Sequence, residues 1–60
     1  MKFKPGDLLI NEWNEHRLVM NIDGDRYLIF YIDHPAPSKL NGSFLQNTDK
    51  HFVETAYKKL

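Results

Sequence analysis

The chain has 60 residues, no cysteine, and equal numbers of basic and acidic side chains, eight of each. A chain of this length forms one domain and buries only about 60% of the surface that its unfolded form exposes, so we expect marginal stability. The lack of cysteine excludes disulfides and thiolate metal sites, and the zero net charge argues against a nonspecific polyanion binder. Hydrophobic residues make up 42% of the chain, which is enough for a small core and too many for disorder.

No targeting segment or membrane span is expected. Residues 1–6 lack the apolar stretch of a signal peptide, and no apolar run approaches the roughly 18 residues that a membrane-spanning helix requires. We therefore expect a soluble, cytoplasmic protein.

The N-terminal third predicts a turn, a short strand and a loop. Residues 4–7, Lys-Pro-Gly-Asp, have turn chemistry because the proline fixes φ and the glycine tolerates positive φ. Residues 8–10 then form a short apolar strand. Residues 11–16 are polar apart from Trp13 and are too many for a tight hairpin, so we interpret them as an exposed loop.

A β-hairpin around Gly24 is the strongest local signal in the chain. Asp23-Gly24-Asp25 separates two runs rich in β-branched and aromatic residues, 17–22 and 27–32. Asp-Gly between such runs favours a tight turn, because Gly24 accepts the positive φ that the turn demands. We expect the rest of the chain to pack around this hairpin.

Two registers of the hairpin fit the sequence, and they bury different side chains. With a three-residue loop over residues 22–24, one face collects Leu18, Met20, Leu28, Phe30 and Ile32. The opposite face then carries Val19, Tyr27, Ile29 and Tyr31. A two-residue Asp23-Gly24 turn would instead group Leu18 and Met20 with the tyrosine face. We favour the first register, with the purely apolar set inside and the phenols outside. In both registers residues 27–32 are apolar on two faces, which indicates a central, bent strand or a binding surface.

The C-terminal half predicts two short strands with a helical turn between them. Residues 34–39, from His34 to Lys39, contain two prolines and are expected to form a loop. Asn41-Gly42 is a turn signal, and residues 43–46 form a fourth strand. Capping side chains at residues 47–49 predict one or two helical turns over residues 50–56. The expected apolar face of that helix is Phe52, Val53 and Ala56. Residues 57–60 close the domain as a fifth strand.

These elements together resemble an SH3-like barrel. Residues 3–9, Phe-Lys-Pro-Gly-Asp-Leu-Leu, resemble the start of the first strand in KOW, Tudor and CarD-type RNA-polymerase-interacting domains. Residues 52–60, Phe-Val-Glu-Thr-Ala-Tyr-Lys-Lys-Leu, are similar to the 3₁₀ turn and closing strand of SH3 folds. The chain is also similar in length and style to small barrel proteins of tailed bacteriophages, some of which bind host proteins. The resemblance implies one all-β domain over residues 1–60, a five-stranded SH3-like barrel with a short helical or 3₁₀ turn before the last strand.

The chain also departs from these families. It lacks the acidic, aromatic-rich first loop and the groove-opening tryptophan of peptide-binding SH3 domains, which argues against proline-rich ligands. It lacks the usual KOW glycine in the first loop. A Tudor-like aromatic cage could be assembled only from Trp13, Tyr27 and Tyr31.

Nothing in the sequence predicts catalysis, a metal or a cofactor. His16, His34 and His51 lack the i, i+3 or i, i+4 spacing of ligands on one element. Only His16 and His34 could become neighbours, because they lie at the open end of the predicted hairpin. The serine and threonine hydroxyls have no adjacent base by motif, and no glycine-rich phosphate loop is present. We expect a non-enzymatic protein.

Three functions remain as hypotheses. The first is a protein-interaction module whose partner-binding residues are Trp13, Tyr27, Ile29 and Tyr31. The resemblance to small phage proteins implies a host protein as its partner. The second is a KOW-like nucleic-acid-binding module that uses Lys2, Lys4, Arg17, Lys58 and Lys59. Lys50 could join this basic face, with Asp23 and Asp25 at the opposite end of a dipolar molecule. The third is a structural subunit that oligomerises through an exposed strand.

Overall fold

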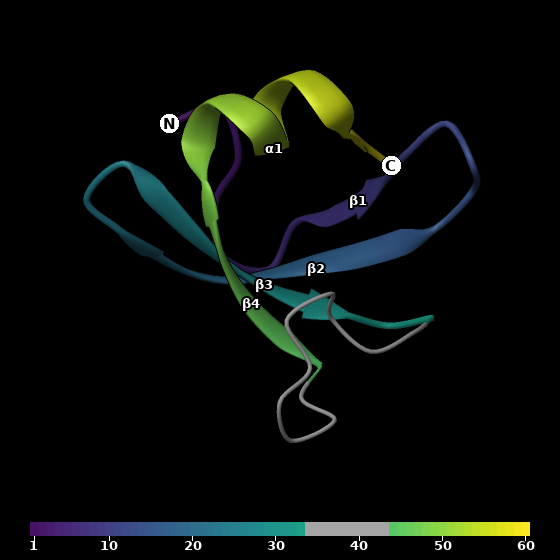
Figure 1. Cartoon of the computed structure of the whole chain (residues 1–60), viewed down its shortest axis with the longest axis horizontal. Coiled ribbons are helices and arrows are strands. Elements are labelled where there is room, and N and C mark those ends of the chain that lie inside the picture. Colours follow the sequence, from purple (N-terminus) through teal and green to yellow (C-terminus); the bar gives the residue numbers. More distant parts are fainter. Residues whose placement is uncertain (34–43) are drawn as a thin grey trace.

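The computed structural model describes residues 1–33 and 44–60. They form β1 Leu8–Ile10, β2 His16–Asp23, β3 Arg26–Tyr31, β4 Leu45–Asp49, α1 Lys50–Ala56 and β5 Lys58–Lys59. The strands make one antiparallel sheet in the order β4-β3-β2-β1-β5, and α1 lies over one of its faces (Figure 1). The mostly β architecture, the five strands and the helix before the last strand are confirmed.

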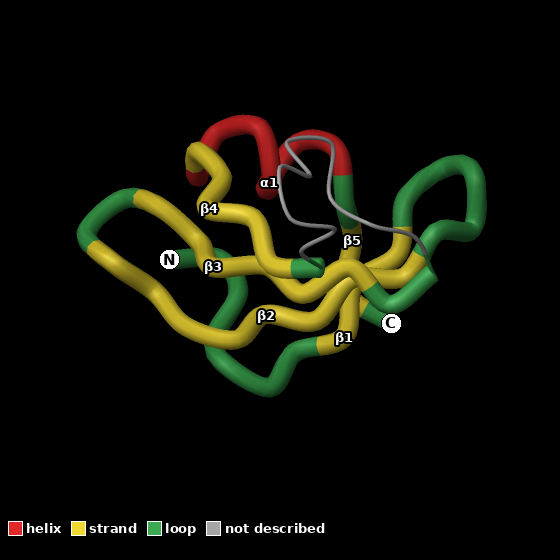
Figure 2. The backbone as a smooth tube through the Cα atoms, turned by 60° about the horizontal axis from the view of Figure 1, so that its bottom comes forward, coloured by secondary structure: helices red, strands yellow, loops and turns green. Residues whose placement is uncertain are grey.

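The first and last strands lie side by side, as the resemblance to SH3-like folds implies. Leu9 pairs with Lys59 and Ile10 pairs with Lys58 (Figure 2). The edges of the sheet are β4 and β5, and no ladder joins them in the described part of the chain. The sheet is therefore curved but open.

Most element boundaries agree with the sequence within a residue or two. The fourth strand is an exception, because β4 runs from Leu45 to Asp49 and begins two residues later than expected. The predicted loop over residues 34–39, the Asn41-Gly42 turn and the start of the predicted fourth strand at Ser43 lie outside the described residues. No helix in residues 1–33 or 44–60 is long and apolar enough to cross a membrane.

The hairpin turn differs from both predicted loops. Asp23 pairs with Arg26, so the loop is the two-residue segment Gly24-Asp25, with Gly24 at φ 62°. A glycine with positive φ at the first loop position matches the twist of the flanking strands. A bulge at Met20, between the Val19–Ile29 and Asn21–Leu28 pairs, then shifts the register by one residue.

The bulge preserves the predicted grouping of side chains into two faces. The face that is buried, however, is the one predicted to be exposed. Leu18 lies opposite Phe30 and Val19 lies opposite Ile29, so the side chains share faces as in the favoured register, although the individual pairs differ from that register. The core, however, contains the face predicted to be outside: Val19, Tyr27, Ile29 and Tyr31, with Phe3, Leu9, Val53 and Tyr57. The prediction that the purely apolar set would be buried is wrong, because the tyrosine hydroxyls find hydrogen-bond partners at the edge of the core.

Tyr27 shows how a phenol is accommodated in this core. Its side chain is fully buried, and its hydroxyl donates to a carboxylate oxygen of Glu54 at 2.5 Å. The same hydroxyl accepts the backbone N–H of Phe3 at 3.1 Å, and Glu54 also accepts the backbone N–H of Lys2 at 2.9 Å. A buried polar group is tolerated when it is fully hydrogen-bonded. This network ties the N-terminus, β3 and α1 together.

The helix begins where the capping residues predict. Asp49 is the N-cap, and its carboxylate accepts the backbone N–H of Phe52 at 3.2 Å. Of the three residues expected on the apolar face, Val53 is fully buried. Phe52 and Ala56 are exposed, so that part of the prediction is wrong. The Phe52 ring instead meets Tyr57 edge-on, with ring centroids 6.3 Å apart.

Removal of the Tyr27 hydroxyl tests its role in the core. We expect Tyr27→Phe to lower the free energy of unfolding by about 1–2 kcal/mol, because the Glu54 carboxylate and the Phe3 N–H lose a partner. The midpoint of thermal unfolding should fall by several degrees. A double-mutant cycle with Glu54→Gln should show coupling between the two sites. Additive effects would contradict the hydrogen bond.

Acid should destabilise the fold through two carboxylates. The pKa of Asp7 is lowered chiefly by the backbone N–H of Lys4, and the pKa of Glu54 is lowered chiefly by the Tyr27 hydroxyl. A lowered folded-state pKa stabilises the protein above the unfolded value, near pH 4, and this contribution is lost as pH falls through the folded pKa. We expect Asp7→Asn to lower the free energy of unfolding at pH 7, measured by urea unfolding. The same variant should lose less of this free energy than the wild type between pH 7 and pH 3. If the variant loses as much free energy of unfolding as the wild type over this pH range, the ionised Asp7 carboxylate does not stabilise the fold.

Candidate protein-interaction site

The first loop, residues 11–15, is held by one asparagine side chain. The Asn11 amide oxygen accepts the backbone N–H groups of Trp13 and Glu15, both at 3.0 Å, and its NH₂ group donates to the Glu15 carboxylate at 2.8 Å. The Asn11 carbonyl also accepts the N–H of Asn14, which takes a positive φ of 62°. An asparagine that bonds its own following backbone is a local turn device. The loop therefore has a defined shape.

This ordered loop presents the single tryptophan of the chain to solvent. Trp13 is 71% exposed, the largest exposed fraction among the exposed large hydrophobic side chains of the described residues. Tryptophan contributes strongly to binding energy in protein interfaces. A loop that is already shaped loses less entropy on binding than a flexible one. Trp13 therefore has the properties of a preorganised anchor.

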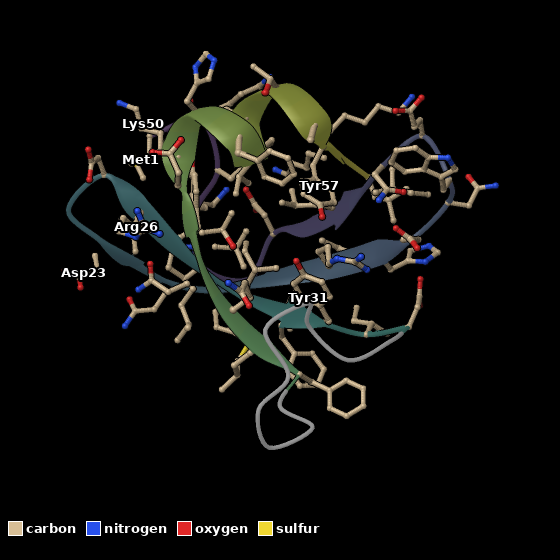
Figure 3. The ribbon with its side chains drawn as sticks, in the orientation of Figure 1. Met1, Asp23, Arg26, Tyr31, Lys50 and Tyr57 are labelled. Carbon is tan, nitrogen blue, oxygen red and sulfur yellow. The ribbon has the colours of Figure 1, made fainter. Side chains whose placement is uncertain are left out.

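A cleft of about 510 Å³ lies beside the loop, between the sheet and the C-terminal part of α1. Its aromatic wall consists of Trp13, Tyr31, Phe52 and Tyr57. Figure 3 shows Tyr31 and Tyr57 in the space between the sheet and the end of the helix. A second cleft, of about 570 Å³, continues past the loop and shares four lining residues with the first: Asn11, Glu12, Ala56 and Tyr57. We call the two clefts together the loop–helix groove.

A buried cation forms part of the groove floor. Arg17 is only 4% exposed, and its guanidinium carbon lies 3.9 Å from the centre of the Tyr31 ring. The guanidinium donates to the His16 carbonyl at 2.9 Å and to the Glu15 carboxylate at 3.3 Å. Stacking and two hydrogen bonds offset the cost of burying the charge. Burial also raises the pKa of Tyr31, with a smaller contribution from Tyr57, so its phenol is neutral at physiological pH.

Within residues 1–33 and 44–60, two buried polar atoms near the groove have no hydrogen-bond partner: Arg17 Nε and Thr48 Oγ1. Both residues line the cleft that contains Trp13. An unsatisfied buried group costs stability. This part of the structure is consequently less well optimised than the Tyr27 network.

The structure brings together only two of the four predicted partner-binding residues. Trp13 and Tyr31 both line the loop–helix groove. Tyr27 and Ile29 are fully buried in the core, so the predicted exposed surface of Tyr27, Ile29 and Tyr31 is wrong. The error follows from the inverted choice of hairpin face. Even Tyr31, at 7% exposed, contributes only an edge to the groove.

The roles of Asn11, Arg17, Phe52 and Tyr57 in the groove were not predicted from the sequence. The burial of Arg17 could have been predicted, because Arg17 and Val19 are two residues apart in β2 and therefore lie on the same face of the strand. Asn11 carries a weaker signal, since asparagine often organises turns. No local pattern places Tyr57 opposite Tyr31, because that contact joins residues far apart in the chain.

The predicted basic face is only partly assembled. Lys4 and Lys59 both lie beside the Asp7 carboxylate, at 3.5 and 3.6 Å, which neutralises part of their charge. Lys58 is exposed on β5. Lys2 lies against α1, where its Nζ donates to the Glu54 carbonyl at 3.2 Å. Arg17 is buried, so its expected contact with phosphates is wrong.

The expected separation of charges is also wrong at Lys50. Its backbone N–H donates to the Asp25 carbonyl at 3.1 Å, which places Lys50 against the hairpin tip. Figure 3 shows Met1, Lys50, Arg26 and Asp23 at this same end of the molecule. Acidic and basic side chains are therefore mixed there.

No cluster of three potential metal ligands occurs within residues 1–33 and 44–60. His16 Nδ1 lies 3.4 Å from a carboxylate oxygen of Asp33. Its predicted neighbour His34 lies outside the described residues, so that pairing stays a prediction.

Comparison with known proteins adds no relative. No family model matches the chain, and neither a curated protein nor a solved structure shows significant similarity to it.

Replacement of Arg17 by lysine tests the packing of the groove floor. An ammonium group cannot reproduce both the planar stacking on Tyr31 and the two hydrogen bonds. We expect Arg17→Lys to lower the free energy of unfolding by about 1–3 kcal/mol, measured by urea unfolding. Arg26→Lys, at an exposed position, is the matched control and should change stability by less than about 0.5 kcal/mol. Equal effects of the two changes would contradict a specific role for Arg17.

Proposed function

We propose that this protein is a non-enzymatic protein-interaction module with an SH3-like barrel fold, and that it binds its partner through the loop–helix groove. The single observation that carries the proposal is Trp13, which is 71% exposed on a loop fixed by Asn11. Exposed tryptophan is unfavourable in water, and side chains of this type act as interface anchors. The groove beside it supplies an aromatic wall for the partner.

The strand order supports the SH3-like part of the proposal. The sheet order β4-β3-β2-β1-β5 and the helix directly before β5 support this proposal, and closure of the barrel is the part that the strand pairs of the described residues do not include. Fold alone does not determine function. The proposal of a protein partner therefore depends on the groove. The resemblance to small barrel proteins of phages adds a second proposal, that this partner is a host protein.

The charges of the groove favour a protein over a nucleic acid. Arg17 is paired with Glu15, and Glu12 lies in both clefts. A phosphate backbone requires accessible cations. Of the five residues in the nucleic-acid hypothesis, Arg17 is buried and Lys4 and Lys59 face Asp7. These positions favour the protein-interaction hypothesis over the nucleic-acid hypothesis.

Capture experiments with matched variants test the proposal. The immobilised protein is exposed to extract from its native cell, in parallel with Trp13→Ala and with His51→Ala, a control at an exposed position of α1 that lines neither cleft. We expect a specific partner to be retained by the wild type and by His51→Ala. Trp13→Ala should weaken the purified complex by about 30-fold or more, as for an interface hot spot.

Intrinsic fluorescence gives an independent measurement on the purified complex. Trp13 is the only tryptophan of the chain, so its emission should shift to shorter wavelength when the partner covers the indole. Asn11→Ala should weaken binding and speed amide exchange at Trp13 and Glu15, because the loop loses its organising side chain. A partner that binds Trp13→Ala as tightly as the wild type, with no fluorescence shift, would overturn the proposal.

A further inference from the structure

The first cleft of the loop–helix groove, the one of about 510 Å³ that contains Trp13, has an excess of negative charge. Among the described residues, its charged lining consists of Glu12, Glu15 and Arg17. The Arg17 charge is paired, because its guanidinium donates to the Glu15 carboxylate at 3.3 Å. Glu12 is exposed and forms no ion pair with any residue in 1–33 or 44–60. The cleft therefore keeps one accessible negative charge.

Two aromatic rings of the same cleft are open to solvent. Trp13 and Phe52 are exposed, whereas Tyr31 and Tyr57 are buried. The face of an aromatic ring attracts a cation, and tryptophan does so most strongly. Glu12 precedes Trp13 in the chain, and both line this cleft. The first loop therefore presents a carboxylate and an indole ring to the same space.

The protein already holds one guanidinium by this combination of groups. The guanidinium carbon of Arg17 lies 3.9 Å from the centre of the Tyr31 ring, and the same guanidinium donates to Glu15 of the first loop. Trp13 and Glu12 are a second aromatic ring and a second carboxylate of that loop. In the described part of the chain, no cation lies over the Trp13 ring or beside the Glu12 carboxylate. This second pair is open to a cation from another molecule.

We propose that the first cleft binds an arginine side chain of the partner protein, held by the Trp13 ring and the Glu12 carboxylate. The inference rests on the proposed function, since it names the chemistry that the groove recognises. A guanidinium suits these two groups better than an ammonium, because it is planar, stacks on aromatic rings and donates two parallel hydrogen bonds to a carboxylate. Apolar side chains next to the arginine pack against the exposed ring of Phe52.

An acidic partner fits this cleft poorly. Arg17 is buried, so its charge is not presented to a phosphate or a carboxylate. An incoming anion would also lie beside Glu12 and Glu15, and like charges across an interface oppose binding. Lys58 is exposed, but it lines the second cleft and not the first. Charge complementarity therefore selects a basic segment of a protein.

Titration with blocked pentapeptides, followed by the backbone amide signals of residues 11–15 in nuclear magnetic resonance spectra, tests the inference. The peptides have the sequence alanine-leucine-X-leucine-alanine, with arginine, lysine, glutamine or glutamate at X. We expect the arginine peptide to bind about tenfold more tightly than the glutamine peptide. The lysine peptide should lie between these two, and the glutamate peptide should bind most weakly.

Variants of the loop separate the two groups that hold the arginine. Glu12→Gln and Trp13→Leu should each reduce the preference for arginine over glutamine to about threefold, because each keeps one of the two contacts. Glu12→Lys should make the glutamate peptide bind more tightly than the arginine peptide. Asp25→Asn, which removes one negative charge at the exposed hairpin tip, is the matched control and should leave the preference unchanged.

Equal binding of the arginine and glutamine peptides, tighter binding of the lysine peptide, or no binding of any peptide at millimolar concentration would overturn the inference. An effect of Asp25→Asn as large as that of Glu12→Gln would also overturn it, because the net charge of the protein would then explain the preference. The capture experiment with Trp13→Ala tests the proposed function separately. A captured partner that requires Trp13 but tolerates Glu12→Lys would overturn the arginine site and leave the proposed function standing.

Discussion

The burial of tyrosine hydroxyls is the constraint on which the rest of this structure depends. A phenol can lie inside a small core only if its hydroxyl is hydrogen-bonded. Tyr27 meets this condition through Glu54 of α1 and the backbone of Phe3. Tyr31 lies against the Arg17 guanidinium. Because these partners come from the N-terminus, β2 and the helix, the contacts that hold the two tyrosines also fix how the helix sits on the sheet.

This choice of face gives the molecule two different surfaces. On the concave side, Arg17 and Tyr31 form the floor of a groove beside the fixed loop that carries Trp13. On the outer side, the leucine and phenylalanine side chains that would ordinarily form a core stay half-buried or exposed. A single bulge at Met20 links the two outcomes, since it keeps Leu18 in line with Phe30 and Val19 in line with Ile29. The groove and the exposed apolar side chains of the outer face are therefore consequences of one strand register.

Local chemistry in the sequence was sufficient to predict the elements of the fold. The apolar runs, the glycine at the hairpin turn and the Asp49 cap gave the strands and the helix over residues 50–56. The buried face could not be predicted, because Tyr27 is stable inside only through Glu54, which lies 27 residues further along the chain. The same division holds for the candidate site, where local features could be predicted and long-range contacts could not. The exposure of Trp13 follows from its polar neighbours, whereas the burial of Arg17 and the contact of Tyr31 with Tyr57 depend on distant parts of the chain.

The most direct test of this account is a set of side-chain nuclear Overhauser effects in solution, recorded at low protein concentration. We expect the rings of Tyr27 and Tyr31 to contact core residues such as Leu9 and Val53, while Leu28 and Phe30 show no contact with Val53. Contacts from Leu28 and Phe30 to Val53, with the tyrosine rings exposed, would mean that the sheet buries its other face. That result would contradict both the groove and the assignment of the buried face.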